Sequence, residues 1–357
     1  MRNCLLIPFV LLILCKTLNA QTVSDYKIPV IANKAARMLM LQQQWVAVQQ
    51  TPSQLGVRDC FLFLLDAIDT KFIEQNKVEW VLKLVQKRMI SNPTAGKSYG
   101  NIFWGWNETG IDIGDGNNIE FCMQYGMLIK LLYNNRLSDN ARKTLDEIFT
   151  LGLKGARNQE VRVSYTNIYL MKIWNFIAFS QVYNQPAILE EGRSYFNKWL
   201  KHVANFGNTE YDSPTYSGVD MESLLLINTF CTDPDIKAKV ADVLNLFMTD
   251  IISHYHPLGG FLGGAHSRDY NRVFGRDLLE EKYFNPLLGK QNNNTQLFNQ
   301  ICLSALEKLG LSPVQKALMN RQNRFMVQRW DSLPHTYACD YVGKKVSLSS
   351  TNQAYSP

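Results

Sequence analysis

The chain has 357 residues, with 37 Lys and Arg against 31 Asp and Glu, which gives a formal net charge of +6. This mild excess, without any run of basic residues, excludes a typical nucleic-acid-binding protein. The cysteines are too widely spaced for a zinc motif or a disulfide framework. Four of them lie among apolar residues of helical pattern, and we expect buried thiols at Cys60, Cys122, Cys231 and Cys302.

Residues 1–20 have the pattern of a secretory signal peptide. Arg2 supplies the basic start, residues 5–14 form an apolar core, and Ala20 ends a small-residue cleavage site. The apolar run is too short to cross a bilayer, and no later segment approaches the roughly 18 apolar residues that a span needs. We therefore expect an exported protein, periplasmic or secreted, with no membrane span.

Hydrophobic periodicity predicts helices along most of the remaining chain, and we expect no strand before residue 330. A long loop with two Trp and six Gly interrupts them at residues 91–117. The predicted helices cover residues 25–50, 58–72, 76–90, 118–133, 138–151, 167–183, 185–204, 218–231, 233–253, 277–288, 295–309 and 312–328.

Three of these helices begin at regular intervals. The openings at Asn118, Asn167 and Gly218 lie 49 and 51 residues apart, and an amphipathic partner helix follows each. A repeat of helix pairs indicates stacked αα-hairpins. Because the first helix of each pair is apolar nearly all round, we expect an all-α fold, an (α/α)6-type toroid over residues 21–330. Residues 331–357 form either a tail or the start of a β domain.

The polar stretch before the third opening is the first candidate site. It contains Glu210 and Asp212, two residues apart, with Asn208, Tyr211 and Tyr216 around them. Paired carboxylates serve as acid and base in glycoside hydrolysis. The alternative is that Asp212 and its neighbours only turn the chain at Pro214.

The Gly-rich loop that follows the last hairpin is the second candidate. It places His266, Arg268 and Tyr270 within five residues. Abstraction of a proton next to a carboxylate needs a base, a proton donor to the leaving oxygen, and a group that neutralises the developing enolate. The alternative is a surface loop with an Arg–Asp ion pair.

His254 and His256 end a predicted helix just before Pro257. A His-x-His pair is able to ligate a metal ion, but His also stabilises the negative end of a helix, and we favour this capping role. His256 remains a candidate for substrate binding. We expect no metal and no cofactor, since the chain has no Walker loop, dinucleotide fingerprint or His-Glu-x-x-His motif.

The long loop supplies a candidate platform for sugars. Trp104 and Trp106 lie close in sequence to Asn118 and Glu120, and sugar rings bind to aromatic faces flanked by polar groups. Tyr165 and Asn167 occupy the equivalent place one hairpin later. The alternative is that both Trp fill the core.

The chain resembles the (α/α)-toroid polysaccharide lyases in the regular spacing of its predicted helical hairpins and in His266, Arg268 and Tyr270. These lyases include alginate, hyaluronate and heparinase II/III-like enzymes. The resemblance is one of architecture over residues 25–330. It implies an Asn or Arg that neutralises the substrate carboxylate, a His base and a Tyr acid; the matching positions are Asn167 or Asn118, Arg268, His266 and Tyr270.

The resulting expectation is an exported enzyme that cleaves a uronic-acid linkage by β-elimination, with an acidic oligo- or polysaccharide as its substrate. Two alternatives stay open. One is a toroid glycoside hydrolase that uses Glu210 or Asp212, and the other is a glycan-binding protein without catalysis. The oligomeric state does not follow from the sequence.

Overall fold

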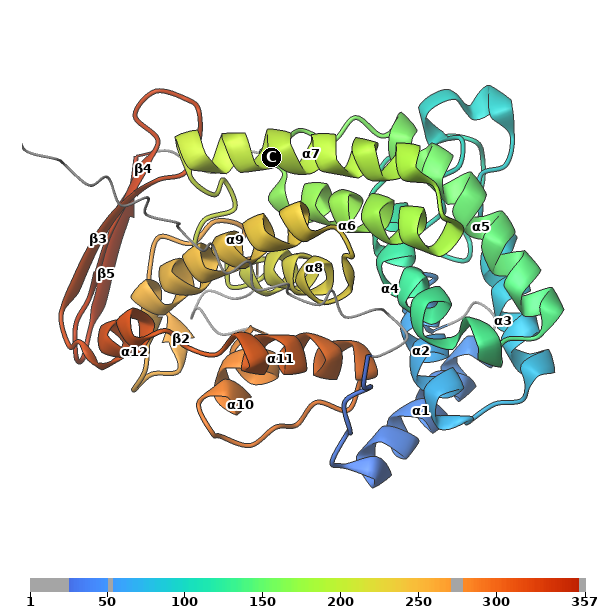
Figure 1. Ribbon diagram of the computed structural model, residues 1–357, viewed down its shortest axis with the longest axis horizontal. Coiled ribbons are helices and arrows are strands. Elements are labelled where there is room, and N and C mark those ends of the chain that lie inside the picture. Colours follow the sequence, from blue (N-terminus) through green and yellow to red (C-terminus); the bar gives the residue numbers. More distant parts are fainter. Residues whose placement is uncertain (1–25, 51–53, 271–278, 353–357) are drawn as a thin grey trace, which may run out of the picture.

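The computed structural model describes residues 26–50, 54–270 and 279–352. The predicted signal peptide lies outside these residues. The described chain is mostly helical, which confirms the all-α class (Figure 1). None of the helices described is long and apolar enough to cross a bilayer.

The predicted helices are present with shifts of a few residues at most ends. They are α1 Lys34–Gln49, α2 Asp59–Thr70, α3 Gln75–Gln86, α4 Asn118–Tyr133, α5 Asp139–Asn158, α6 Thr166–Tyr183, α7 Pro186–Phe206, α8 Ser217–Phe230, α9 Pro234–His254, α11 Leu297–Leu309 and α12 Pro313–Asn320. The long loop contains a 3-10 segment, Pro93–Ser98, and an isolated β-bridge from Ile102 to Met89. A second 3-10 turn, Asn134–Arg136, follows α4.

The helix that we expected over residues 277–288 is present but irregular. Its first two residues lie outside the described residues. The rest is helical from residue 279 to 287, with a π-helical turn, Glu280–Phe284, followed directly by the short α10, Asn285–Leu287. Pro286 cannot donate a backbone hydrogen bond to the preceding turn, which favours an irregular pattern here.

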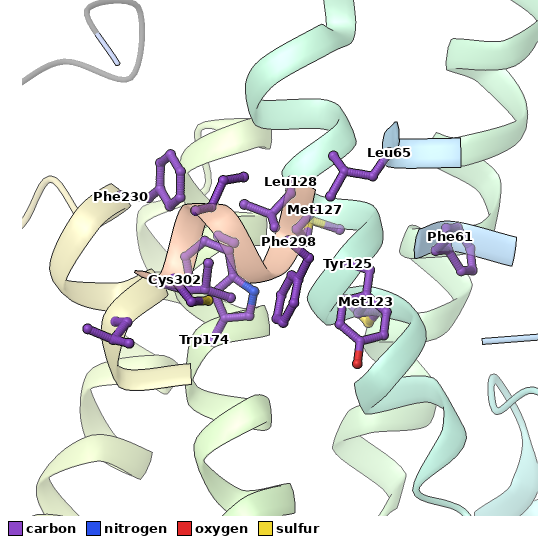
Figure 2. Close-up of a cluster of buried hydrophobic side chains, with 14 of the residues drawn as sticks. Phe61, Leu65, Met123, Tyr125, Met127, Leu128, Trp174, Phe230, Phe298 and Cys302 are labelled. Atoms are coloured by element: carbon purple, nitrogen blue, oxygen red, sulfur yellow. The ribbon is translucent and has the colours of Figure 1, made fainter. Parts of the chain in front are cut away.

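A group of buried helices forms the centre of the molecule. Helix α2 packs on α4, α4 on α6, α6 on α8 and α8 on α11, and α11 also contacts α2. Their side chains meet in one apolar core, where Trp174 of α6, Tyr125 of α4 and Phe298 of α11 lie together (Figure 2). The four cysteines expected to be buried thiols, Cys60, Cys122, Cys231 and Cys302, are buried and free.

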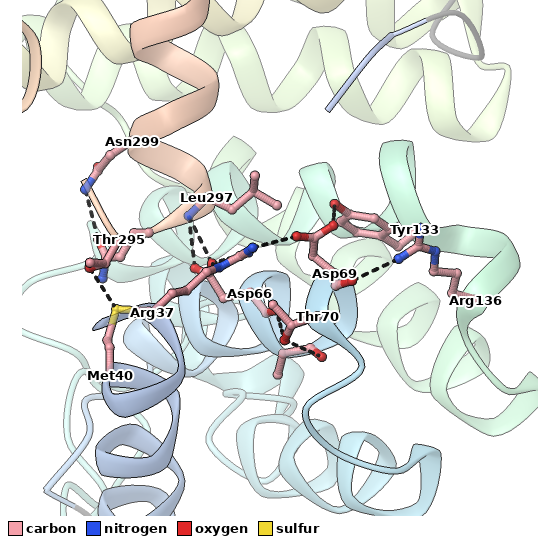
Figure 3. Close-up of polar contacts among 12 residues, drawn as sticks. Arg37, Met40, Asp66, Asp69, Thr70, Tyr133, Arg136, Thr295, Leu297 and Asn299 are labelled. Atoms are coloured by element: carbon pink, nitrogen blue, oxygen red, sulfur yellow. Dashed lines mark hydrogen bonds and ion pairs between the residues drawn. The ribbon is translucent and has the colours of Figure 1, made fainter. Parts of the chain in front are cut away.

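Polar contacts tie the first helices of the described chain to α11 (Figure 3). The carboxylate of Asp66 accepts the backbone N–H of Leu297 at 3.0 Å and so caps the start of α11. Arg37 of α1 donates to Asp66 at 2.7 Å and to Asp69 at 2.8 Å, while the hydroxyl of Tyr133 donates to Asp69 at 2.7 Å. Every charge in this group therefore has a partner of opposite sign.

Two small antiparallel sheets complete the fold. Strands β1 Tyr255–His256 and β2 Phe261–Leu262 form a hairpin after α9, and β3 Arg324–Arg329, β4 Tyr337–Val342 and β5 Ser347–Thr351 form a three-stranded sheet in that order. The expectations of no strand before residue 330 and of a helix to residue 328 were wrong. Side chains alternate along β3, where buried Arg324 donates to the carbonyl of Ile252 at 2.6 Å and Phe325 faces solvent. This two-residue alternation is that of a strand.

Candidate functional site

The starts of α4, α6 and α8 meet at one end of the helical group. Asn117 donates to the hydroxyl of Tyr165 at 3.1 Å, which links the start of α4 to that of α6. Thr166 donates to Asn208 at 2.9 Å, and the backbone N–H of Asn167 donates to Glu210 at 2.7 Å. The loop between α7 and α8 is therefore fixed across the N-terminus of α6, where the unpaired N–H groups and the helix dipole favour a carboxylate.

Arg268 lies at the centre of this arrangement. Its guanidinium forms an ion pair with Glu210 and donates to the hydroxyl of Tyr270 at 2.9 Å. It also lies against aromatic rings, 3.9 Å from the ring centre of Tyr216 and 4.9 Å from that of Tyr165. We call these five residues the Arg268 cluster. Burial would lower the pKa of Arg268, but Glu210 and the neighbouring hydroxyls raise it, so the cation is permanent.

The backbone around the cluster is strained. Asp212, Arg268 and Tyr270 have φ values of 42°, 48° and 49°, in the left-handed region that side chains with a Cβ avoid. Each such residue costs about 1–3 kcal/mol and persists only where the surrounding structure imposes it. Three of them on two facing loops indicate that these loops are held for a purpose other than stability.

The Arg268 cluster has an exposed residue, and a buried side chain without hydrogen-bond partners lies next to it. Tyr270 is 60% exposed. Asn167 is 1% exposed, and neither atom of its side-chain amide has a hydrogen-bond partner among the residues described here. Buried amides are normally paired, so a group such as this one is available to a ligand or to water. Tyr216 is half-buried, and burial raises its pKa.

His266 lies beside Asp212, two residues before Arg268 in the chain. Its Nε2 atom donates to the carbonyl of Leu262 at 2.9 Å and lies 3.8 Å from the carboxylate of Asp212. The bond to a carbonyl places the proton on Nε2 and leaves the lone pair on Nδ1. Burial lowers the pKa of His266, and the hydrogen bond to the carbonyl of Leu262, which raises the pKa, does not outweigh it. The ring is therefore neutral near pH 7.

Asp212 is covered by the backbone of the His266 loop. A Cβ added to Gly264 would lie 1.6 Å from the carboxylate of Asp212, so only glycine permits this approach. Glu210 is also buried, at 0% exposure. Neither carboxylate therefore faces solvent.

A second buried group connects the site to the C-terminal sheet. The Nε2 atom of His254 lies 3.3 Å from the carboxylate of Asp340, which also accepts the backbone N–H of Ala265 at 3.1 Å. Nδ1 of His254 donates to the carbonyl of Asp250 at 2.8 Å, the capping contact expected at the end of this helix. Burial lowers the pKa of His254, but Asp212 and Asp340 outweigh it and raise the pKa to about 10.

The long loop at residues 91–117 lies beside the Arg268 cluster, since Asn117 at its end contacts Tyr165. Trp104 is half-buried and donates to the carbonyl of Asp115 at 3.1 Å, and Trp106 donates to that of Leu55 at 2.7 Å. The guanidinium of Arg58 lies 5.9 Å from the ring centre of Trp104. Both Trp are half-buried, and Trp106 packs against the core, in line with the alternative that it fills the core.

Four other candidates are buried away from the Arg268 cluster. Asn118 donates to the carbonyl of Phe103 at 2.8 Å, and Glu120 accepts from Asn175 at 2.7 Å inside the helical group. Tyr211 stacks on Trp330, and His256 stacks on Phe261. Their contacts are those of structural residues.

Sequence reasoning missed the roles of Asp220, His254 and Asp340. Asp220 is 0% exposed in the first turn of α8, and burial, then Glu210, raise its pKa well above the ordinary value. The sequence signal that could have identified Asp220 is a carboxylate at the start of an apolar helix. His254 was noted only as a cap, and nothing in the sequence links it to Asp340, 86 residues further on.

Comparison with known proteins gives a family. A family model described as a domain of unknown function (DUF8769) matches residues 70–304, which is more than half of the chain. The chain belongs to the DUF8769 family. The matched region contains every residue of the Arg268 cluster. No curated protein and no solved structure matches the chain. Within the described part of the DUF8769 protein, no three His, Cys, Asp or Glu side chains are grouped to hold a metal ion.

Proposed function

We propose that this protein is an exported polysaccharide lyase with an (α/α) toroid, and that the Arg268 cluster is its catalytic site. The succession of contacts from α2 to α11, with α11 returning to α2, supports the toroid. The observation that carries the function is the Arg268 guanidinium, which is held by Glu210, Tyr165, Tyr216 and Tyr270 near the starts of α6 and α8, with Tyr270 60% exposed.

Tyr270 suits the role of proton donor. Its oxygen accepts hydrogen bonds from Arg268, at 2.9 Å and 3.3 Å, and a guanidinium accepts none, so Arg268 does not occupy the O–H of Tyr270. A donor is required because the leaving oxygen of the glycosidic bond becomes negative during elimination. Arg268 keeps the phenol in place, since the guanidinium is fixed by the charge of Glu210.

Asn167 and His266 complete the chemistry. The unpaired amide of Asn167, beside the start of α6, donates to the uronate carboxylate and disperses the charge of the enolate. His266 is neutral with its lone pair on Nδ1, the state in which an imidazole removes a proton. The half-exposed face of Trp104 supplies a neighbouring sugar subsite.

The geometry favours elimination over hydrolysis. A hydrolase needs one carboxyl group that donates a proton to the leaving oxygen and a second that faces the sugar. Glu210 is fully buried and engaged by both Arg268 and the N–H of Asn167, and Asp212 lies beneath Gly264. Neither is placed to reach a glycosidic oxygen.

The test is incubation of the mature protein with a panel of uronic-acid polysaccharides. Elimination leaves a conjugated double bond, so ultraviolet absorbance rises together with new reducing ends. We expect this rise for at least one polymer, and we expect His266→Ala to abolish it. New reducing ends without absorbance would replace the proposal with a hydrolase. Binding without either product would replace it with a glycan-binding protein.

A further inference from the structure

One face of the three-stranded sheet is directed away from the helices (Figure 1). In the register of the sheet, Phe325, Tyr341 and Leu348 form one row across β3, β4 and β5. Val327 and Tyr337 lie further along the same face. Phe325 is 70% exposed, Leu348 67% and Val327 58%. We call these five residues the outer sheet face. Exposed apolar groups this close together mark binding surfaces more often than isolated ones do.

The size of this face excludes one class of occupant. Three strands about 4.8 Å apart and about 20 Å long cover roughly 200–300 Å². A stable protein–protein interface buries about 800 Å² on each partner. The outer sheet face alone is therefore too small for a stable dimer, but it is large enough for a few sugar rings.

The chemistry of the face points to an acidic sugar chain. Aromatic rings on a flat surface stack on the apolar faces of sugars, and hydroxyls at their edges form hydrogen bonds. Within the described strands, no acidic side chain shares this face, because Asp340 points inward. Exposed Arg321, Lys344 and Lys345 lie at the end of the sheet where the Phe325 row crosses. Their charges attract a polyanion.

We propose that the outer sheet face is a second binding surface for an acidic polysaccharide, separate from the Arg268 cluster. The inference rests on the proposed function for the class of polymer. It adds that the protein holds its substrate at a distance from the catalytic site, which raises the local concentration of linkages to be cleaved.

The test uses native gel electrophoresis with alginate in the gel, in a Tyr270→Phe background so that the polymer is not consumed. We expect alginate to retard the protein, and we expect Phe325→Ser with Leu348→Ser to weaken this apparent affinity about tenfold. Leu39→Ser, an equally exposed leucine on α1 that is 55% exposed, is the control and leaves the affinity unchanged. Adding Lys344→Ala and Lys345→Ala weakens the apparent affinity for alginate further and makes this affinity less dependent on salt concentration.

Several results would overturn the inference. They are the absence of retardation, equal retardation by a neutral glucan, and retention of full affinity in the double serine variant. If sedimentation shows a dimer for the parent and a monomer for that variant, the outer sheet face binds a second copy of the chain and not a polysaccharide. Failure of the catalytic proposal is distinguishable, because binding would then depend on Phe325 and Leu348 while no polymer is cleaved.

Discussion

Arg37 and Arg268 are each paired with a buried carboxylate, and their surroundings differ. Arg37 binds Asp66 and Asp69, and these carboxylates also accept the N–H of Leu297 and the hydroxyl of Tyr133. Arg268 binds Glu210 and Tyr270 on strained backbone, beside an unpaired Asn167 amide. A group on regular helices whose carboxylates all have partners stabilises the fold. An arginine held on strained loops beside unused polar atoms is placed for a ligand.

Removal of Asp66 has the largest expected effect on stability. Asp66→Ala leaves Arg37 buried with one partner fewer and removes the cap of α11, so we expect a loss of about 3–5 kcal/mol in the free energy of unfolding. Chemical denaturation measures it. Asp139→Ala, at an ion pair whose carboxylate is 93% exposed, is the control and changes the free energy by less than about 1 kcal/mol. A loss below 1 kcal/mol for Asp66→Ala would contradict the structural role of this group.

Glu120 gives a smaller effect that depends on pH. Burial raises its pKa from 4.5 to about 7, although Lys172 and Asn175 oppose this. The unfolded chain loses the proton near pH 4.5 and the folded chain near pH 7. The folded state therefore binds more protons in this window, and stability falls by about 3 kcal/mol as the pH rises through it.

The variant Glu120→Gln removes this dependence. Its amide also supplies a donor beside Asn175, whose side-chain oxygen has no hydrogen-bond partner among the described residues. We expect the variant to gain stability over the parent as the pH rises from 5 to 8. Denaturation at a series of pH values measures the difference, with exposed Glu74→Gln as the control. A constant difference across the window would show that Glu120 is charged throughout.

Much of the fold followed from the sequence, because helices depend on local spacing. Helices α4, α6 and α8 begin within one residue of the predicted openings at Asn118, Asn167 and Gly218. The sheet did not follow, because the apolar residues Phe325 and Val327 lie on its exposed face and so disguise the usual pattern of a strand. The pairing of Glu210 with Arg268 joins residues 58 apart, and no local pattern reports such a contact.

The candidate site was predicted as a set of residue types rather than as a geometry. The sequence indicated Arg268, Tyr270, Tyr216, Tyr165 and Glu210, which the structure brings together. It also indicated Tyr211, Asn118 and Glu120, which the structure buries elsewhere. Polar residues near helix starts look alike in sequence, and only the packing decides whether each one faces a ligand or the core.

The proton-donor role of Tyr270 is the most direct test of the account. Elimination on the best polyuronate is measured by ultraviolet absorbance for the parent, for Tyr270→Phe and for Tyr195→Phe, a half-buried tyrosine on α7 that belongs to neither proposed site. General-acid catalysis contributes about 10²–10⁴-fold, so we expect Tyr270→Phe to lose this factor while Tyr195→Phe keeps the parent rate. An unchanged rate in a folded Tyr270→Phe protein would contradict the assignment of the Arg268 cluster as the catalytic site.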